Sequence, residues 1–141
     1  MVSFLESTIS LCVESVVLVL LITGYLKKRQ KKYRTHALTM LSALILHIIS
    51  ILIVMSPSLA AFFGGPGAIN FADALVITAL THVSAGLLAA LLGIWLVTSW
   101  HLQTNLQTCF KKKRVMDATI ILWLIAFFLG IYLYLIVTQI I

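Results

Sequence analysis

Four long apolar stretches dominate the pattern of hydrophobic and polar positions along the chain. They cover residues 4–26, 36–56, about 73–100 and 115–138. Each reaches or exceeds the ~20 residues with which an α-helix crosses ~30 Å of hydrocarbon. Lipid cannot satisfy free backbone polar groups, and the stretches lack the alternation of a membrane barrel, so all four should be helices. The pattern predicts an all-α fold in which residues 1–141 form a single transmembrane domain, an integral membrane four-helix bundle.

The basic residues predict how this bundle is oriented. All ten Lys and Arg residues lie in two short segments, 27–34 and 111–114. Basic residues in short loops stay on the cytoplasmic side, so we expect both segments in the cytoplasm and both termini outside. Membrane topology also accounts for the net charge of +6, which therefore does not indicate nucleic-acid binding. The expected partners of the basic loops are anionic headgroups of membrane lipids.

The ends of the stretches carry turn and helix-start signals. An outer loop is expected from Pro57 to about Ala72, because the Gly- and Pro-rich segment 64–67 turns sharply and cannot be helical throughout. Asp73 and Asp117 are expected to mark helix starts, where a carboxylate suits the helix dipole.

Small residues recur four apart in the third stretch, as Gly86 with Ala90 and Ala89 with Gly93. Small residues let helix backbones approach closely, so the favoured interpretation is tight helix packing. The other interpretation is room for a flat cofactor beside the helix, and the two are compatible if the cofactor lies on one side of the stripe. Packing and anchoring at the membrane interface are also the favoured roles of the three tryptophans, Trp95, Trp100 and Trp123.

Four histidines are the groups with obvious ligand chemistry. His36 and His101 lie near the expected cytoplasmic edge, whereas His47 and His82 lie within the bilayer. Polar groups at that depth are costly and usually mark a bundle interior or a function. Neutral imidazole is a common ligand of haem iron and of other metals. The expected cofactor is haem b, and copper is the other metal considered.

Depth decides which histidines can share one ligand. His47 lies nine residues before the end of the second stretch, and His82 lies nine residues after the start of the third. At ~1.5 Å per residue, each is roughly 13 Å from the outer edge, and the two can face each other as a bis-histidine haem requires. A second haem at His36 and His101 is harder to place, because the histidine spacings on the two helices differ by about 12 Å. One site with His47 and His82 is therefore favoured over two.

Glu14 and the intramembrane histidines also have interpretations without a cofactor. A histidine at this depth can be a hydrogen-bonded packing residue. Glu14 lies near mid-membrane, close in depth to His47. A carboxyl group there can fix the tautomer of a ligand histidine or carry protons. It can equally stay protonated and pair with a hydroxyl, and the sequence leaves these alternatives open.

Six motifs follow one another between about residues 20 and 136: Thr23-Gly24-Tyr25, His36 with Met40, Phe63-Gly64-Gly65-Pro66, Leu80-Thr81-His82, Trp100-His101 and Gly130-Ile131-Tyr132-Leu133-Tyr134. Their order and spacing resemble the CtaM/YozB-like family, small four-helix bacterial and archaeal membrane proteins linked to assembly of haem-copper terminal oxidases. The resemblance implies His36, His82 and His101 as the polar set. His47 has no counterpart, and Lys111 to Arg114 stand where the family tends to carry another histidine. His82 is thus common to the resemblance and to the depth argument.

The residues and the resemblance together give one expected function and two alternatives. The expected function is haem or metal binding that supports assembly of a respiratory haem-copper oxidase, with no turnover of its own. The resemblance implies the plasma membrane of a bacterium or archaeon, membrane subunits of respiratory complexes as partners, and room for oligomers. The alternatives are a b-type cytochrome subunit that transfers electrons within a respiratory complex, and a scaffold subunit without a cofactor.

Overall fold

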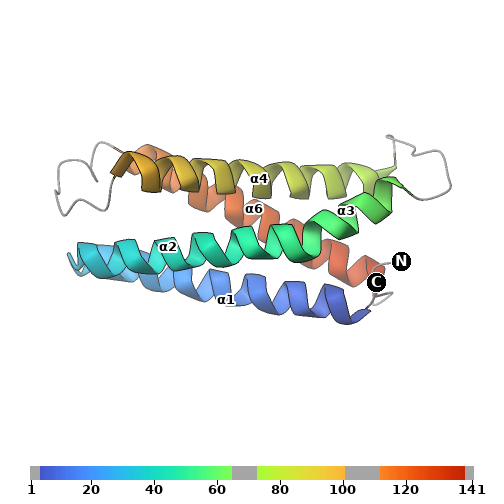
Figure 1. Cartoon of the computed structure of the whole chain (residues 1–141), viewed down its shortest axis with the longest axis horizontal. Coiled ribbons are helices and arrows are strands. Elements are labelled where there is room, and N and C mark those ends of the chain that lie inside the picture. The colour runs from blue at the N-terminus through green and yellow to red at the C-terminus, as the bar shows by residue number, and fades with distance from the viewer. Residues whose placement is uncertain (1–3, 65–72, 101–111, 139–141) are drawn as a thin grey trace.

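The computed structural model describes residues 4–64, 73–100 and 112–138, and within these ranges it is helical apart from short turns. Four helical segments are long and apolar enough to span a membrane. They are α1 (Phe4–Arg29), the segment that begins with α2 (Tyr33–Ser50), α4 (Ala74–Trp100) and α6 (Lys113–Val137). Figure 1 shows them as an elongated bundle, with the start of α1 and the end of α6 at the same end. The all-α four-helix prediction is confirmed for the described residues.

The bundle consists of two helix hairpins. α1 packs mainly against α2, and α4 packs mainly against α6, whereas packing between the two hairpins is sparser. The first hairpin turns within residues 30–32, where Lys31 has a left-handed φ of 59°. This turn is shorter than the basic segment 27–34, because the basic residues 27–29 continue α1, where Lys and Arg suit the negative end of the helix dipole.

The second membrane helix is longer than predicted. We expected it to end at Ser56, but it continues through a π-helical turn, η1 (Ile51–Met55), into α3 (Ser56–Phe63). Pro57 explains the turn, because proline has no N–H and crowds the carbonyl four residues before it. The helix widens ahead of the proline, so that the Ser56 N–H donates to the Ile51 carbonyl, five residues back. The predicted outer loop was therefore wrong for residues 57–63, and residues 65–72 lie outside the described ranges.

One of the two predicted helix-start carboxylates is confirmed. The Asp73 carboxylate accepts the backbone N–H of Leu75 over 3.0 Å, and so caps the start of α4. Asp117 was wrongly placed at a helix start, since α6 begins at Lys113. Lys and Arg are good helix formers, and the helix extends one turn into the basic segment.

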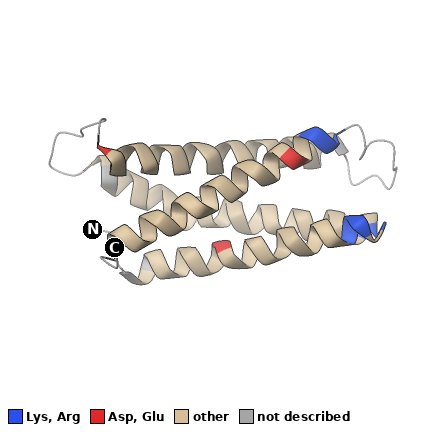
Figure 2. Cartoon of the chain, turned by 180° about the vertical axis from the view of Figure 1, so that it is seen from behind, with Lys and Arg blue, Asp and Glu red and all other residues tan. Residues whose placement is uncertain are grey.

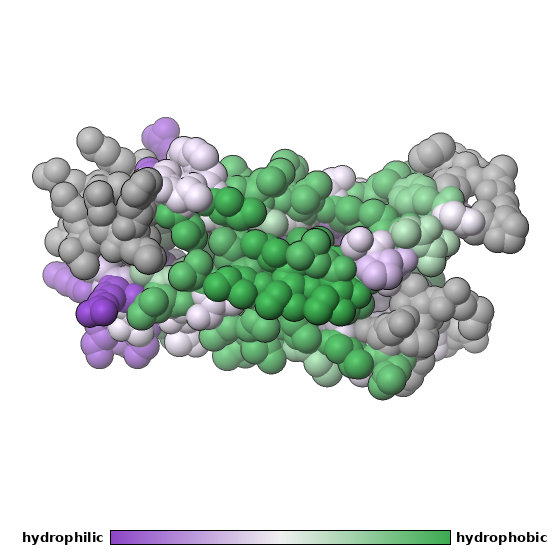
Figure 3. Space-filling model, in the orientation of Figure 1, coloured by the Kyte–Doolittle hydropathy of each residue, from purple (hydrophilic) through white to green (hydrophobic). Residues whose placement is uncertain are grey.

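Both basic segments lie at one end of the bundle. Figure 2 shows Lys and Arg at the turn between α1 and α2 and at the start of α6. Figure 3 shows hydrophobic residues over the middle of the visible face and hydrophilic residues towards that end. Large apolar side chains point outward, among them Leu52, Ile53 and Phe128 at 65% to 69% exposure. An apolar belt of this kind suits contact with lipid in a multi-pass membrane protein.

The small residues of α4 lie where neighbouring helices approach closely. Three are buried: Gly86, Ala89 and Ala90. A Cβ atom on Gly93 would lie 2.8 Å from Leu44 Cδ1 of α2, and one on Gly86 would lie 3.9 Å from Ala126 Cβ of α6. The packing interpretation is therefore confirmed, because the small residues of α4 pack against both α2 and α6.

Candidate functional site

A buried carboxyl–imidazole pair joins α1 to α2 inside the bundle. His47 Nδ1 lies 3.0 Å from Glu14 Oε1 and 3.3 Å from Oε2. Glu14 is 8% exposed and His47 is 4% exposed. On the other side of the ring, His47 Nε2 lies 3.4 Å from the Gly86 carbonyl oxygen of α4, a long contact for a hydrogen bond. Counting residues placed Glu14 and His47 at one depth, and the structure brings them into contact.

The proton arrangement of this pair decides whether His47 can act as a ligand. When Glu14 is a carboxylate, the His47 Nδ1–H donates to it. Nε2 then carries either a second proton, donated to Gly86, or a lone pair, and only the lone pair can bind a metal. Of the roles left open for Glu14, orientation of the His47 ring is the one that this contact supports, because ligand histidines often donate their other N–H to a carboxylate.

His36 is held by the backbone of α1. Its Nδ1–H donates to the Gly24 carbonyl oxygen over 2.7 Å, and the residue is 5% exposed. Because a carbonyl oxygen only accepts, Nδ1 carries the proton and Nε2 of the neutral ring carries the lone pair. Gly24 also contacts Met40, since a Cβ atom there would lie 2.9 Å from Met40 Cε, the end of that side chain. Three residues from two motifs of the resemblance, Gly24 from one and His36 and Met40 from the other, thus lie together.

His82 is directed towards α6. Its Nδ1–H donates to the Ala126 carbonyl oxygen over 2.8 Å, which again leaves the lone pair on Nε2. The ring lies against Gly130, where an added Cβ atom would be 3.0 Å from His82 Cε1. Gly130, another residue of the resemblance, therefore provides the space that the His82 ring occupies.

The structure brings His47 and His82 close in depth but turns their rings to different neighbours. His47 reaches the carbonyl of Gly86, which lies one helical turn from His82 on α4. His36 lies eleven residues from His47 on the same helix, about 16 Å away, so these two cannot bind one metal ion. His101 lies outside the described residues. Within those ranges, no group of three His, Cys, Asp or Glu side chains could hold a metal ion.

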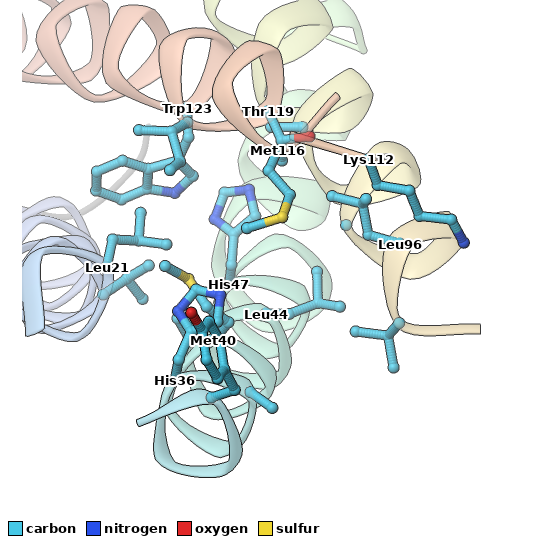
Figure 4. A pocket seen from close by; sticks show the side chains of 18 residues that line it. Leu21, His36, Met40, Leu44, His47, Leu96, Lys112, Met116, Thr119 and Trp123 are labelled. Carbon is cyan, nitrogen blue, oxygen red and sulfur yellow. The ribbon is translucent and has the colours of Figure 1, made fainter. Parts of the chain in front are cut away.

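A cavity of about 140 Å³ lies between the two hairpins. All four long helices contribute to its lining, which is mainly apolar. Figure 4 shows the rings of His36 and His47 at the cavity, with the thioether of Met116 and the indole of Trp123 facing them from α6. Ala89 and Gly93, two of the small residues of α4, also line the cavity. There is therefore some space beside this helix, although it is small.

The donor atoms fit a haem iron or a metal ion, whereas the cavity is too small for a porphyrin. A volume of about 140 Å³ is well below the ~300 Å³ from which pockets for larger organic ligands begin. His82 does not line the cavity, and the backbone of α4 covers Nε2 of His47. A porphyrin between His47 and His82 requires α2 and α4 to separate. The sparse packing between the hairpins makes that separation less costly than opening either hairpin.

Trp123 is a candidate functional residue that the sequence did not reveal. We interpreted it as a packing residue, and it does stack on Phe127 with ring centroids 5.3 Å apart. Its Nε1–H, however, is buried and has no hydrogen-bond partner among the described residues. No pattern in the sequence marks an unpaired indole, because its surroundings come from helices that are distant along the chain.

Comparisons with protein-family profiles, with curated proteins and with solved structures found no match to this chain. The resemblance to the CtaM/YozB-like family therefore rests on the six sequence motifs alone.

Proposed function

We propose that this protein binds a haem or a metal ion through histidine nitrogens inside the membrane and supports assembly of a respiratory haem-copper oxidase. One feature shared by His36, His47 and His82 carries the binding proposal: in each, Nδ1 lies within hydrogen-bond distance of an oxygen atom. Metal-ligating histidines usually donate one ring N–H to such an oxygen, which leaves the other nitrogen for the metal.

His47 and His82 are the residues that would hold a haem, and a bound haem would supply a redox-active iron. The protein's own contribution is to orient the two rings and to exclude water. Glu14 orients His47, and the Ala126 carbonyl orients His82. The small cavity favours transient rather than permanent holding, because a bound porphyrin would keep the two hairpins apart and weaken the packing between them.

Copper is the second candidate for the bound metal, and the composition of the cavity favours it. Met40 and Met116 line the same cavity as His36. Thioether sulfur is a soft ligand suited to Cu(I), and the neutral His36 ring offers a lone pair on Nε2. This second arrangement uses the end of the cavity nearest the basic segments and does not require a porphyrin.

The proposed setting is the plasma membrane of a bacterium or archaeon, with both basic segments in the cytoplasm. The apolar belt favours membrane partners, and the proposed partners are membrane subunits of a respiratory complex. The assembly role rests on the resemblance to the CtaM/YozB-like family. A b-type cytochrome subunit uses the same ligands, and a cofactor-free scaffold uses the same hydrogen bonds, so the functional test must separate all three.

Deletion of the gene tests the assembly role. We expect less assembled terminal oxidase, measured as loss of oxidase haem from isolated membranes. Wild-type protein should restore it and the His82→Ala variant should not, whereas Cys12→Ala, a change at an exposed position, should restore it fully. Normal oxidase haem together with loss of quinol-driven electron flow would replace this proposal with the cytochrome. Full restoration by His82→Ala would favour the scaffold.

A further inference from the structure

The cavity between the hairpins holds a hydrogen-bond donor that the proposed haem or metal site does not use. Trp123 is 4% exposed and lines the cavity. Its Nε1–H has no partner within the ranges that the structure describes. A buried donor is costly to leave unpaired. An unpaired donor that borders a cavity points to a ligand with an acceptor atom.

The direction of this N–H is fixed by packing. One face of the indole stacks on Phe127, with an interplanar angle of 16°. The ring also meets His47 edge to face, with centroids 6.4 Å apart and an angle of 72°. Figure 4 shows the indole nitrogen on the edge of the ring nearest His47. The indole therefore cannot turn to another acceptor without losing both ring contacts.

Simpler occupants fit this position less well. No acceptor of the described residues lies within hydrogen-bond distance of the indole N–H. A single water fills only part of a cavity of about 140 Å³, most of whose lining consists of aliphatic side chains and thioethers. A lipid acyl chain can fill the space but brings no acceptor to the indole. The occupant must therefore be largely apolar and carry an acceptor oxygen of its own.

The size of the cavity suits a ligand with one six-membered ring. Its volume of about 140 Å³ is close to the ~150 Å³ of an engineered apolar cavity that binds benzene. A quinone ring has this size and carries two carbonyl oxygens, and isoprenoid quinones dissolve in the bilayer. We propose that the cavity binds the ring of an isoprenoid quinone, with one carbonyl oxygen accepting the Trp123 N–H. The cavity is not fully enclosed, so the tail can extend into the lipid.

This quinone site goes beyond the proposed haem or metal binding and stands independently of it. Its anchor is the Trp123 N–H, whereas the proposed ligation uses Nε2 of the histidines. The test therefore uses purified full-length protein in detergent, prepared without haem or added metal. Failure of quinone binding leaves the haem proposal intact, and a colourless protein can still bind the quinone.

Two ring molecules of matched shape test the hydrogen bond. Duroquinone carries four methyl groups and two carbonyls, and durene is the benzene that carries the four methyl groups without the carbonyls. Affinities come from the rise in melting temperature with ligand concentration, because a ligand that binds the folded state stabilises it. Wild-type protein should prefer duroquinone, and Trp123→Phe should reduce that preference about 2- to 12-fold, the value of one neutral hydrogen bond.

The matched control is Trp95→Phe, which removes an indole that is 47% exposed and should leave the preference unchanged. Equal affinity of wild-type protein for durene and duroquinone overturns the proposal. So does a preference that survives Trp123→Phe. A second readout avoids any change at Trp123. In the double variant Trp95→Phe, Trp100→Phe, duroquinone should quench the remaining tryptophan emission saturably, and quenching without saturation contradicts the site.

Discussion

At the scale of single residues, the polar side chains inside this bundle are held by specific oxygen atoms. Counting along the sequence placed Glu14, His47 and His82 at similar depths, and this much follows from the rise of an α-helix. The sequence did not predict that His47 bonds Glu14 while His82 bonds the Ala126 carbonyl. That choice depends on how each helix is rotated against its neighbours, and apolar residues surround these helices too evenly to indicate the rotation.

The contact between Glu14 and His47 should contribute to stability. Glu14→Ala leaves the buried Nδ1 of His47 without its partner, which should lower the free energy of unfolding by about 1–3 kcal/mol. Glu14→Gln is the control, because its amide oxygen can still accept from Nδ1–H and its loss should be smaller. Unfolding in mixed micelles of mild and denaturing detergent provides the measurement. Equal stability of Glu14→Ala and wild-type protein would show that the pair is not a stabilising contact.

At the scale of the helices, the molecule is a pair of hairpins whose close contacts depend on glycine. The sequence predicted the four spans, and it predicted that small residues of the third span pack closely. It did not predict that α2 continues to Phe63 through a π-turn. Nor did it show that packing is close within each hairpin and sparser between them. Pro57 could have signalled the π-turn, but proline also fits the start of a loop, and only the packed helix distinguishes these outcomes.

Two glycines should respond differently to the same added methyl group. At Gly130, a Cβ atom would lie 3.0 Å from His82 Cε1, so the imidazole must shift against its bond to Ala126. At Gly86, the nearest atom would be 3.9 Å away, an ordinary contact. Gly130→Ala should therefore be about 1–3 kcal/mol less stable than Gly86→Ala, by the usual cost of overpacking. Melting temperatures of the two variants in one detergent test this. Equal melting temperatures would contradict the close approach at Gly130.

At the scale of the whole molecule, charge and hydropathy act together. The apolar helices identify a multi-pass membrane protein, and both basic segments lie at one end of the bundle, as the topology requires. The sequence predicted this arrangement because hydropathy and charge are each summed over many residues. An error of a few residues in the end of a helix therefore does not change the result. The cavity between the hairpins was not predictable in the same way. It depends on how side chains from all four long helices pack together, which the sequence does not show.

The orientation of the bundle can be tested by labelling single cysteines in intact cells. The background variant replaces Cys12 and Cys109 with serine. Gln30→Cys lies in the exposed turn between α1 and α2, and Asp73→Cys lies at the opposite end, before α4. A membrane-impermeant maleimide should label position 73 and not position 30, because basic loops stay in the cytoplasm. Labelling at position 30 together with protection at position 73 would show the opposite orientation and contradict the prediction.

The central claim, that histidines inside this bundle bind a haem, is tested most directly by visible absorption. Wild-type protein is purified from cells supplied with ample haem, and spectra are recorded oxidised and reduced. We predict a low-spin b-type haem in sub-stoichiometric amount. We also predict that His82→Ala abolishes the Soret band although it still inserts, whereas His36→Ala retains the band, because His36 lies about 16 Å from His47 along α2. A colourless wild-type protein, or a Soret band unchanged in His82→Ala, would contradict the account.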